Sequence, residues 1–204
     1  MSTPEFNEEH RDALQEVANV AMGEAGAKLA ELLGTFVRLS VPRIEISAAT
    51  QVPDILGKLL GSDNAVTAVR QSFLSRIQGE AIVLFGEAGC AELADLMGYE
   101  GAFASAQRRE VLLDIANVLV GACLGGVFRQ LGLELGYSAP SLLAENTLAD
   151  RVIHTESLNW RRALLVEVNF RLEQGAFSSH LVILLPEHSI DRLRESLEQM
   201  MATL

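Results

Sequence analysis

The sequence predicts an α/β protein made of two similar halves that are related by pseudo-twofold symmetry. Two stretches with helical periodicity, residues 12–23 and 110–121, carry the same polar motif, and each motif position recurs 98 positions later. The glycine at position 34 and the proline at position 42 recur at the same offset of 98. In each half the pattern predicts a helix, a strand, a short helix, two strands and a helix, in that order. Matches in register at several positions indicate an internal duplication.

The first half is expected to begin with a long helix. Its start is predicted at Thr3 or Asn7, both of which are capping residue types, and its end at Gly34. The elements expected next are a strand over 36–47 that Pro42 interrupts, a short helix over 52–60, antiparallel strands over 65–74 and 81–85 joined by a turn at 78–79, and a helix over 88–97.

The second half is expected to repeat this order after a linker. Residues 99–104 are small and partly polar, as is typical of a connection between two structural units. The elements expected after the linker are a long helix over 106–131 that is capped by Ser105 and stopped by Gly132, a strand through Pro140, a short helical stretch over 142–149, a hairpin of strands 162–172 and 177–185 around a turn at 174–175, and a last helix opened by Pro186.

The composition restricts the classes of partner and compartment. Apolar residues make up 49% of the 204 residues, which is enough for a substantial core. The net charge of −11 argues against binding to nucleic acid or to an anionic membrane. No run approaches the ~20 uncharged apolar residues of a membrane span, and the acidic N-terminus does not resemble a signal peptide, so a cytoplasmic protein is expected. Cys90 and Cys123 lack metal or redox spacing and are expected to be free, buried thiols.

A polar stripe on each long helix is the main functional candidate. Two acidic residues, an asparagine and a glycine follow one another at spacings of four, three and four positions. On a helix of about 3.6 residues per turn, this spacing places all four in one narrow stripe that points away from the apolar face. Mid-helix asparagine and glycine cost roughly 0.5 and 1 kcal/mol relative to alanine, so their repeated use calls for a reason. The stripe residues are Asp12, Glu16, Asn19 and Gly23 in the first copy and Glu110, Asp114, Asn117 and Gly121 in the second.

The pattern Asp12-x3-Glu16-x2-Asn19-x22-Pro42 resembles the signature of the CheC/CheX/FliY family of phosphatases, which act on the chemotaxis response regulator CheY. The resemblance covers nearly the whole chain, because CheC is also an internal duplication of about this size. It implies a single CheC-like domain over residues 1–204, made of repeats at about 5–98 and 105–202. Since about three strands per half would form a marginal sheet, it also implies one shared, mostly antiparallel sheet of about six strands, with both long helices on one face.

The resemblance further implies an enzyme that hydrolyses the aspartyl phosphate of a CheY-like receiver domain. It assigns placement of the attacking water to Asn19 and Asn117, and pairing with a lysine of the partner to Glu16 and Asp114. A carboxamide suits this role, because its oxygen accepts a hydrogen bond from water while its nitrogen donates to a phosphoryl oxygen. No cofactor of the chain's own is expected, with Mg²⁺ on the phosphorylated partner. The remaining stripe residues are expected to bind the partner: Asp12, Gly23, Glu110 and Gly121.

The second copy departs from the family pattern at two positions. Its first residue is Glu110, where the family has aspartate or serine, and its acid is Asp114, where the family has glutamate. The aspartate side chain is one methylene shorter, which reduces its reach by about 1.5 Å. A placement error near 1 Å can cost about 100-fold in rate. The second site is therefore expected to be weaker than the first, or silent.

Other interpretations stay open from the sequence. A non-catalytic adaptor or flagellar-switch-like module of the same fold would bind a response regulator, or a CheD-like deamidase, without turnover. A Glu-x-x-Asn pair on an exposed helix is often only solvated surface. Gly23 and Gly121 could instead allow two core helices to cross closely. Monomer and homodimer are equally open.

Overall fold

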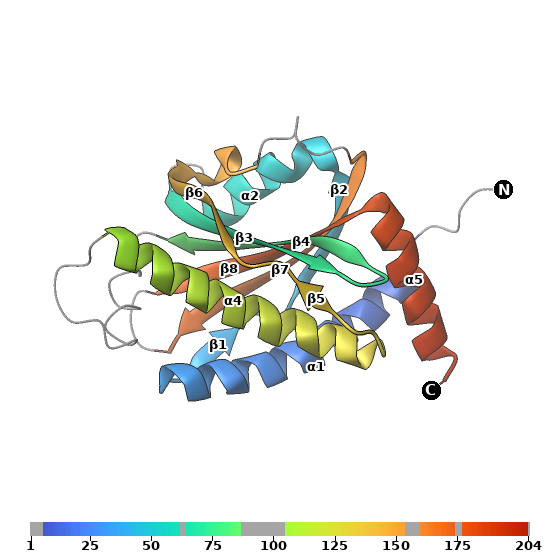
Figure 1. Ribbon diagram of the computed structural model, residues 1–204. Helices are drawn as coiled ribbons and strands as arrows, with labels where there is room; N and C mark the ends of the chain where they lie inside the picture. The colour runs from blue at the N-terminus through green and yellow to red at the C-terminus, as the bar shows by residue number, and fades with distance from the viewer. Residues whose placement is uncertain (1–5, 62–63, 87–104, 154–159, 174–176, 204) are drawn as a thin grey trace.

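A curled antiparallel sheet forms the centre of the protein (Figure 1). The computed structural model describes residues 6–61, 64–86, 105–153, 160–173 and 177–203. Within these ranges eight strands join in the order β1-β7-β8-β4-β3-β5, with β2 also on β7 and β6 also on β3. The strands are β1 Val37–Leu39, β2 Arg43–Ala48, β3 Ala65–Leu74, β4 Gln78–Gly86, β5 Gly136–Tyr137, β6 Ser141–Leu148, β7 Arg162–Leu172 and β8 Ser178–Pro186.

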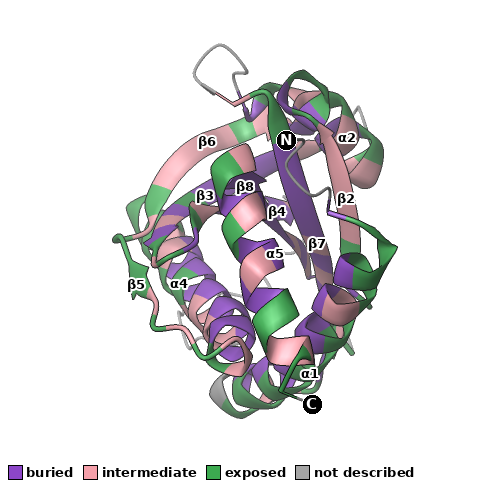
Figure 2. Ribbon diagram, turned by 90° about the vertical axis from the view of Figure 1, so that its right-hand side faces the viewer, coloured by how far each residue is buried: buried purple, intermediate pink, exposed green. Residues whose placement is uncertain are grey.

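Helices cover both faces of this sheet. On one face lie α1 (Glu8–Leu33), α4 (Ser105–Gln130) and α5 (Glu187–Met201), which share one apolar core with the sheet. On the other face, α2 (Val52–Leu60) and the short turns η1 (Ala49–Gln51) and η3 (Ala149–Arg151) lie over a smaller core. Figure 2 shows the central strands β4, β7 and β8 as buried between the two layers. Both long helices therefore lie on the same face, as predicted.

The ends of α1 follow from local hydrogen bonding. Asn7 caps the helix: its Oδ1 accepts from the backbone N of His10 at 3.1 Å, and its own backbone N donates to His10 Nδ1 at 3.2 Å. Of the two predicted starts, Asn7 is the one observed. Gly34 ends the helix with φ 63°, in the left-handed region that glycine adopts without a steric penalty.

The two long helices pack against each other as an antiparallel pair. Gln130 Nε2 donates to the carbonyl of Val17 at 3.2 Å, and Gly126 lies against Ala21. A later residue of α1 therefore contacts an earlier residue of α4, as in an antiparallel pair. A Cβ built on Gly126 would lie 2.8 Å from the Cβ of Ala21. The crossing therefore requires a glycine at position 126, where the helix backbones come closest.

Strands from the two ends of the chain complete each other's pairing. β1 and β2 pair with β7, β5 and β6 pair with β3, and the hairpins β3-β4 and β7-β8 join through β4 and β8. All of these pairs are antiparallel. The strand predicted over 36–47 and its counterpart through Pro140 are each split in two near the proline, which raises the strand number above the six expected. The predicted fold class, an α/β protein with a shared antiparallel sheet, is confirmed.

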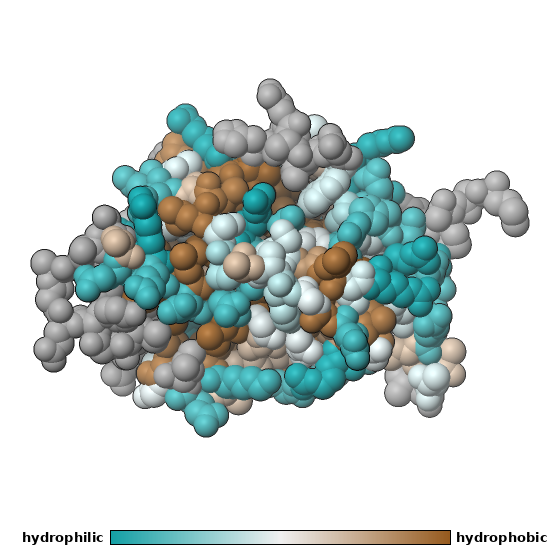
Figure 3. Space-filling model, viewed as in Figure 1, coloured by the Kyte–Doolittle hydropathy of each residue, from teal (hydrophilic) through white to brown (hydrophobic). Residues whose placement is uncertain are grey.

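The prediction of a short helical stretch over 142–149 is wrong. Residues Ser141–Leu148 form β6, which pairs with β3 with register shifts that bend the strand. The leucine, alanine and glutamate in this segment favour a helix locally, but pairing with β3 overrides that preference. Asn146 takes φ 48°, which helps β6 to bend. Figure 3 shows hydrophobic side chains gathered over β6, where Leu142 and Leu143 are only half-buried.

Other expected boundaries differ by a few residues or lie outside the described ranges. The turn between β3 and β4 falls at residues 75–77, ahead of the predicted position at 78–79. α4 begins at Ser105, which is therefore within the helix, and Gly132 follows its end with φ 68°. Cys123 is free and buried, as predicted. The predicted helix over 88–97 with Cys90, the linker over 99–104 and the turn at 174–175 lie outside the described residues.

One described helix, α4, is long and apolar enough to cross a membrane by length and composition alone. An 18-residue stretch of this helix has a mean hydropathy of 2.1, but 61% of that stretch is buried inside the protein. Its apolar side chains pack against the sheet and α1. Packing in the core accounts for the composition of this helix.

Candidate functional site

The first polar stripe lies on the exposed side of α1. Asp12, Glu16, Asn19 and Gly23 are all exposed. The Oδ1 of Asn19 accepts a single long hydrogen bond, 3.4 Å from Nε2 of Gln15 on the preceding turn. Within the described residues, Glu16 forms no ion pair. The acid and the amide are thus both available to a second molecule, one helical turn apart.

A groove opens beside this stripe. It has a volume of about 620 Å³ and lies between α1 and the segment from Phe36 to Pro42, which contains β1. Asn19 and Gly23 line it on the helix side. On the opposite side Phe36 and Val41 are 58% and 72% exposed, which is unusual for large apolar side chains. A protein surface placed over Asn19 would therefore also meet apolar contacts.

The second stripe, on α4, is also at the surface but its amide is held by the fold. Glu110, Asp114 and Asn117 are exposed, and Gly121 is half-buried. The Oδ1 of Asn117 accepts a hydrogen bond of 2.9 Å from Nε2 of Gln71, a buried residue of β3. The sequence pattern places both asparagines correctly at the surface, but it does not reveal this contact.

Gly23 and Gly121 do not serve the helix crossing. A Cβ built on either glycine would meet nothing within 4 Å. The close approach between α1 and α4 occurs at Gly126 and Ala21 instead. The interpretation of the stripe glycines as packing residues is therefore wrong for the described part of the chain. Both leave open space at the surface, next to the asparagine that precedes them by one turn.

The two asparagines lie toward opposite edges of the sheet. Asn19 lines a groove whose other wall contains β1, and Asn117 contacts β3 next to β5. β1 and β5 are the two ends of the strand order. α1 and α4 pack side by side (Figure 1), so the first stripe has its asparagine toward one edge of the sheet and the second stripe has its asparagine toward the other.

The charges near the second stripe differ from those near the first. Arg109, one residue before the stripe begins, bonds Glu145 of β6 through Nε at 3.3 Å and Nη2 at 2.5 Å. The hydrogen bond from Arg109 holds the pKa of Glu145 below its usual range. Next to Gly23 of the first stripe, Glu24 forms an ion pair with Arg129 of α4 at 2.8 Å.

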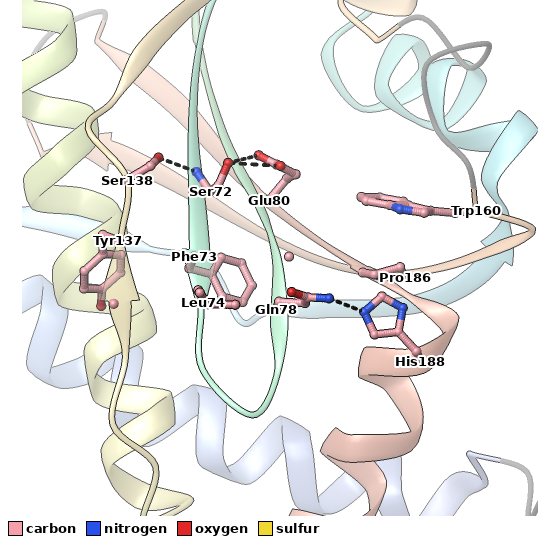
Figure 4. A pocket seen from close by; sticks show the side chains of 12 residues that line it. Ser72, Phe73, Leu74, Gln78, Glu80, Tyr137, Ser138, Trp160, Pro186 and His188 are labelled. Atoms are coloured by element: carbon pink, nitrogen blue, oxygen red, sulfur yellow. Dashed lines mark hydrogen bonds between the residues drawn. The ribbon is translucent and has the colours of Figure 1, made fainter.

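A second hollow of about 520 Å³ contains none of the predicted site residues. It lies between the β3-β4 turn, β5 and the start of α5, and Figure 4 shows Tyr137, Phe73 and Trp160 around it. Its polar groups are engaged with one another: Gln78 Nε2 lies 2.7 Å from His188 Nε2, and Ser72 bonds Glu80. Among the described residues, no group of three or more His, Cys, Asp or Glu side chains is arranged to hold a metal ion.

Comparison with known proteins gives one family match. Residues 9–46, which form α1, β1 and most of β2, match the CheC-like family. This segment includes the whole first stripe and Pro42. No relative was found among curated protein sequences.

Solved structures of chemotaxis and flagellar proteins share the fold over nearly the whole chain. FliY of Thermotoga maritima matches with a TM-score of 0.69 and 17% identity, covering 95% of this chain and 98% of that one. FliM of H. pylori, in a complex with SpeE, matches at 0.65 and 14%, covering 98% and 100%. CheX of Desulfovibrio desulfuricans matches at 0.54 and 12%, covering 82% and 99%. At such identities the similarity shows the fold alone. The chain thus has the fold of the CheC/CheX/FliY family and carries the CheC-like sequence signature in its first helix and the strands that follow it.

Proposed function

We propose that this protein is a phosphatase that hydrolyses the aspartyl phosphate of a CheY-like receiver domain. One observation carries the proposal: within the CheC-like segment, an exposed acid and an exposed asparagine stand one turn apart beside an open groove. We further propose that the chain is one CheC-like domain of two repeats, since its terminal and central strands complete each other's pairing.

In the proposed mechanism the helix supplies placement, and the partner supplies the charge that balances the phosphoryl group. The transition state of phosphoryl transfer is loose, so alignment of the attacking water and electrostatic compensation supply most of the rate. The carboxamide of Asn19 accepts a hydrogen bond from the water and donates to a phosphoryl oxygen. Glu16 pairs with a lysine of the receiver and sets the position of the helix in its cleft. Mg²⁺ held by the partner would compensate the negative charge of the phosphoryl oxygens.

The proposal is tested by phosphate release from a panel of CheY-type receivers phosphorylated with phosphoramidate. Asn19→Ala is expected to lower kcat about 100-fold at the first site, as expected for a lost positioning group. Asn117→Ala alone is expected to have a smaller effect. The double variant should leave only the spontaneous rate of the receiver. A double variant that hydrolyses as fast as the parent would show that the asparagines are not catalytic.

The acid has a matched control on the same helix. Glu16→Gln is expected to weaken receiver binding and raise KM, because it removes the charge that pairs with the partner's lysine. Glu31→Gln changes the charge of α1 by the same amount at another exposed position and should leave KM unchanged. Equal effects of the two variants would indicate long-range attraction by net charge and not a specific pair.

A non-catalytic adaptor or flagellar-switch module is the second candidate. The observation that favours it is the fold similarity to FliM, with a TM-score of 0.65 over 98% of the chain. Under this alternative the protein would bind a phosphorylated receiver, or a CheD-like protein, in a pull-down while phosphate release stayed at the spontaneous rate. Retention of both asparagines favours the enzyme.

A further inference from the structure

We infer that Gln71 is a positioning residue for the second site: it turns the carbonyl oxygen of Asn117 toward the sheet, so that hydrolysis at Asn117 is slower than at Asn19. This inference rests on the proposed function. It adds a cause for unequal sites that lies outside both stripes. It is based on the hydrogen bonds of the buried Gln71 amide, and on the fact that the equivalent residue in the other half is a valine, Val168.

The orientation of both amides follows from a backbone carbonyl. Gln71 Nε2 lies 2.9 Å from the carbonyl oxygen of Ser138 and 2.9 Å from the Asn117 side chain. A carbonyl oxygen only accepts, so the atom of Gln71 that faces it is the NH₂ group. That NH₂ group only donates, so Asn117 turns its oxygen toward Gln71. The NH₂ group of Asn117 therefore faces away from Gln71.

The carbonyl that orients Gln71 is itself fixed. The backbone N of Ser72 donates to Ser138 Oγ at 3.0 Å (Figure 4). In return, the backbone N of Ser138 donates to the Ser72 carbonyl at 3.0 Å. Gln71 is 2% exposed, and its Oε1 has no hydrogen-bond partner among the described residues. A rotated amide would place that oxygen against two other acceptors. Gln71 therefore holds one orientation.

The first site has the same backbone arrangement but lacks the tether, as we call the hydrogen bond from Gln71 to Asn117. Asn169 and Ser40 repeat the exchange made by Ser72 and Ser138: the backbone N of Asn169 donates to Ser40 Oγ at 2.9 Å, and the Ser40 N donates to the Asn169 carbonyl at 2.9 Å. Ser72 thus corresponds to Asn169, and Gln71 to the preceding residue, Val168. Val168 is fully buried and its side chain has no donor. Among the described residues, Asn19 accordingly bonds Gln15 alone, at the surface.

The tether engages Oδ1 of Asn117, which is the atom that would accept a hydrogen bond from the attacking water. In the proposed mechanism the asparagine oxygen accepts a hydrogen bond from the attacking water. At the second site this oxygen is turned toward the sheet, and the outward NH₂ group can donate to a phosphoryl oxygen but cannot accept from water. The Oδ1 of Asn19 accepts a longer hydrogen bond, of 3.4 Å, from Gln15 at the surface, so it can turn outward. The second site therefore retains contact with the phosphoryl group but places water poorly.

The test replaces Gln71 in two ways, each in two backgrounds. Gln71→Val installs the residue found at the equivalent position, and Gln71→Met keeps the length of the side chain without a donor. In an Asn19→Ala background, where only the second site remains, either variant is expected to raise kcat about fivefold with KM unchanged, the rate equivalent of one neutral hydrogen bond. In an Asn117→Ala background the same variants should leave kcat unchanged. Thermal melts confirm folding of each variant, so the Met form serves if the Val form does not fold.

A kcat that stays the same or falls in the Asn19→Ala background would overturn the inference, because it would mean that the tether is neutral or helps. An equal change in both backgrounds would also overturn it, since it would indicate a general effect on the fold. The orientation has its own readout in the NH₂ protons of Gln71, which should exchange slowly with solvent in NMR spectra. If the double asparagine variant keeps full activity, the proposed function fails, and this exchange measurement still decides the orientation: slow exchange supports the tether and fast exchange overturns it.

Discussion

Replacing Gly23 with alanine should make the protein more stable and, under the proposed function, lower its phosphatase activity. Gly23 is exposed in the middle of α1, and an added Cβ meets nothing within 4 Å of the protein itself. Alanine is favoured over glycine inside a helix by about 1 kcal/mol, and no contact in the structure opposes this gain. For a protein of this size, 1 kcal/mol raises the Tm by about 2–4 °C.

A matched control is available on α4. Gly126→Ala makes the same chemical change in a helix interior, but its Cβ would lie 2.8 Å from the Cβ of Ala21 and 3.1 Å from its Cα. Overpacking of this kind costs about 1–3 kcal/mol, which meets or exceeds the gain in helix propensity. The Tm of Gly126→Ala is therefore expected to fall. Thermal melts followed by circular dichroism compare the two variants with the parent.

The functional half of the prediction concerns the partner. If a receiver surface packs closely over Gly23, a methyl group forced into that contact should lower kcat/KM at least about fivefold. The experiment combines melts with phosphate release in an Asn117→Ala background, which isolates the first site. If the Tm of Gly23→Ala does not rise, the conclusion that Gly23 makes no packing contact within the protein is refuted. A raised Tm with unchanged kcat/KM would refute its place in the contact.

Three further predictions concern single side chains. Asp114→Glu restores the missing methylene and, in a variant without the first asparagine, should lower KM for the receiver; an unchanged KM would mean that reach does not limit the second site. Burial raises the pKa of the Cys123 thiol above its ordinary value, so iodoacetamide should label this residue only after unfolding, and labelling of the native protein at the rate of a free thiol would contradict this. The hydrogen bond from Arg194 holds the pKa of Glu198 below its ordinary value, so the stability that this carboxylate contributes is present above about pH 4.5 and lost as the pH falls through the lowered pKa. Urea unfolding should show Glu198→Gln as less stable than the parent at pH 6, with a difference that shrinks below pH 4.5; a difference independent of pH would rule this out.

Local chemistry made most of the fold predictable. Gly34 sets the end of α1, and runs rich in apolar residues give β3 and β7 with the observed bounds. β6 could not be predicted in this way, because its residues favour a helix and its strand state depends on pairing with β3. Turn positions shifted by a few residues, since they depend on the register of the two flanking strands.

Helical spacing predicted the stripe residues of the candidate site, but it could not predict the residues that contact them from other elements. Spacing placed the stripes at the surface, because a helix fixes the direction of each side chain relative to its apolar face. Gln71 was missed, since its contact with Asn117 joins residues 46 positions apart and exists only once the sheet is formed. The groove beside Asn19 was missed for the same reason. A single buried glutamine among the apolar residues of β3 was the available signal, and it did not say which residue it would bind.

The exchange of strands between the two ends of the chain has a consequence for how the motif copies can diverge. Gln71 belongs to the N-terminal copy but bonds the asparagine of the C-terminal copy, and the groove wall beside Asn19 is anchored by pairing of β1 with β7. A substitution in one half of the chain can therefore alter the surroundings of the motif in the other half. Under the proposed function, catalysis at one motif can therefore weaken while every residue of that motif is unchanged, and inspection of the motif alone would overlook this.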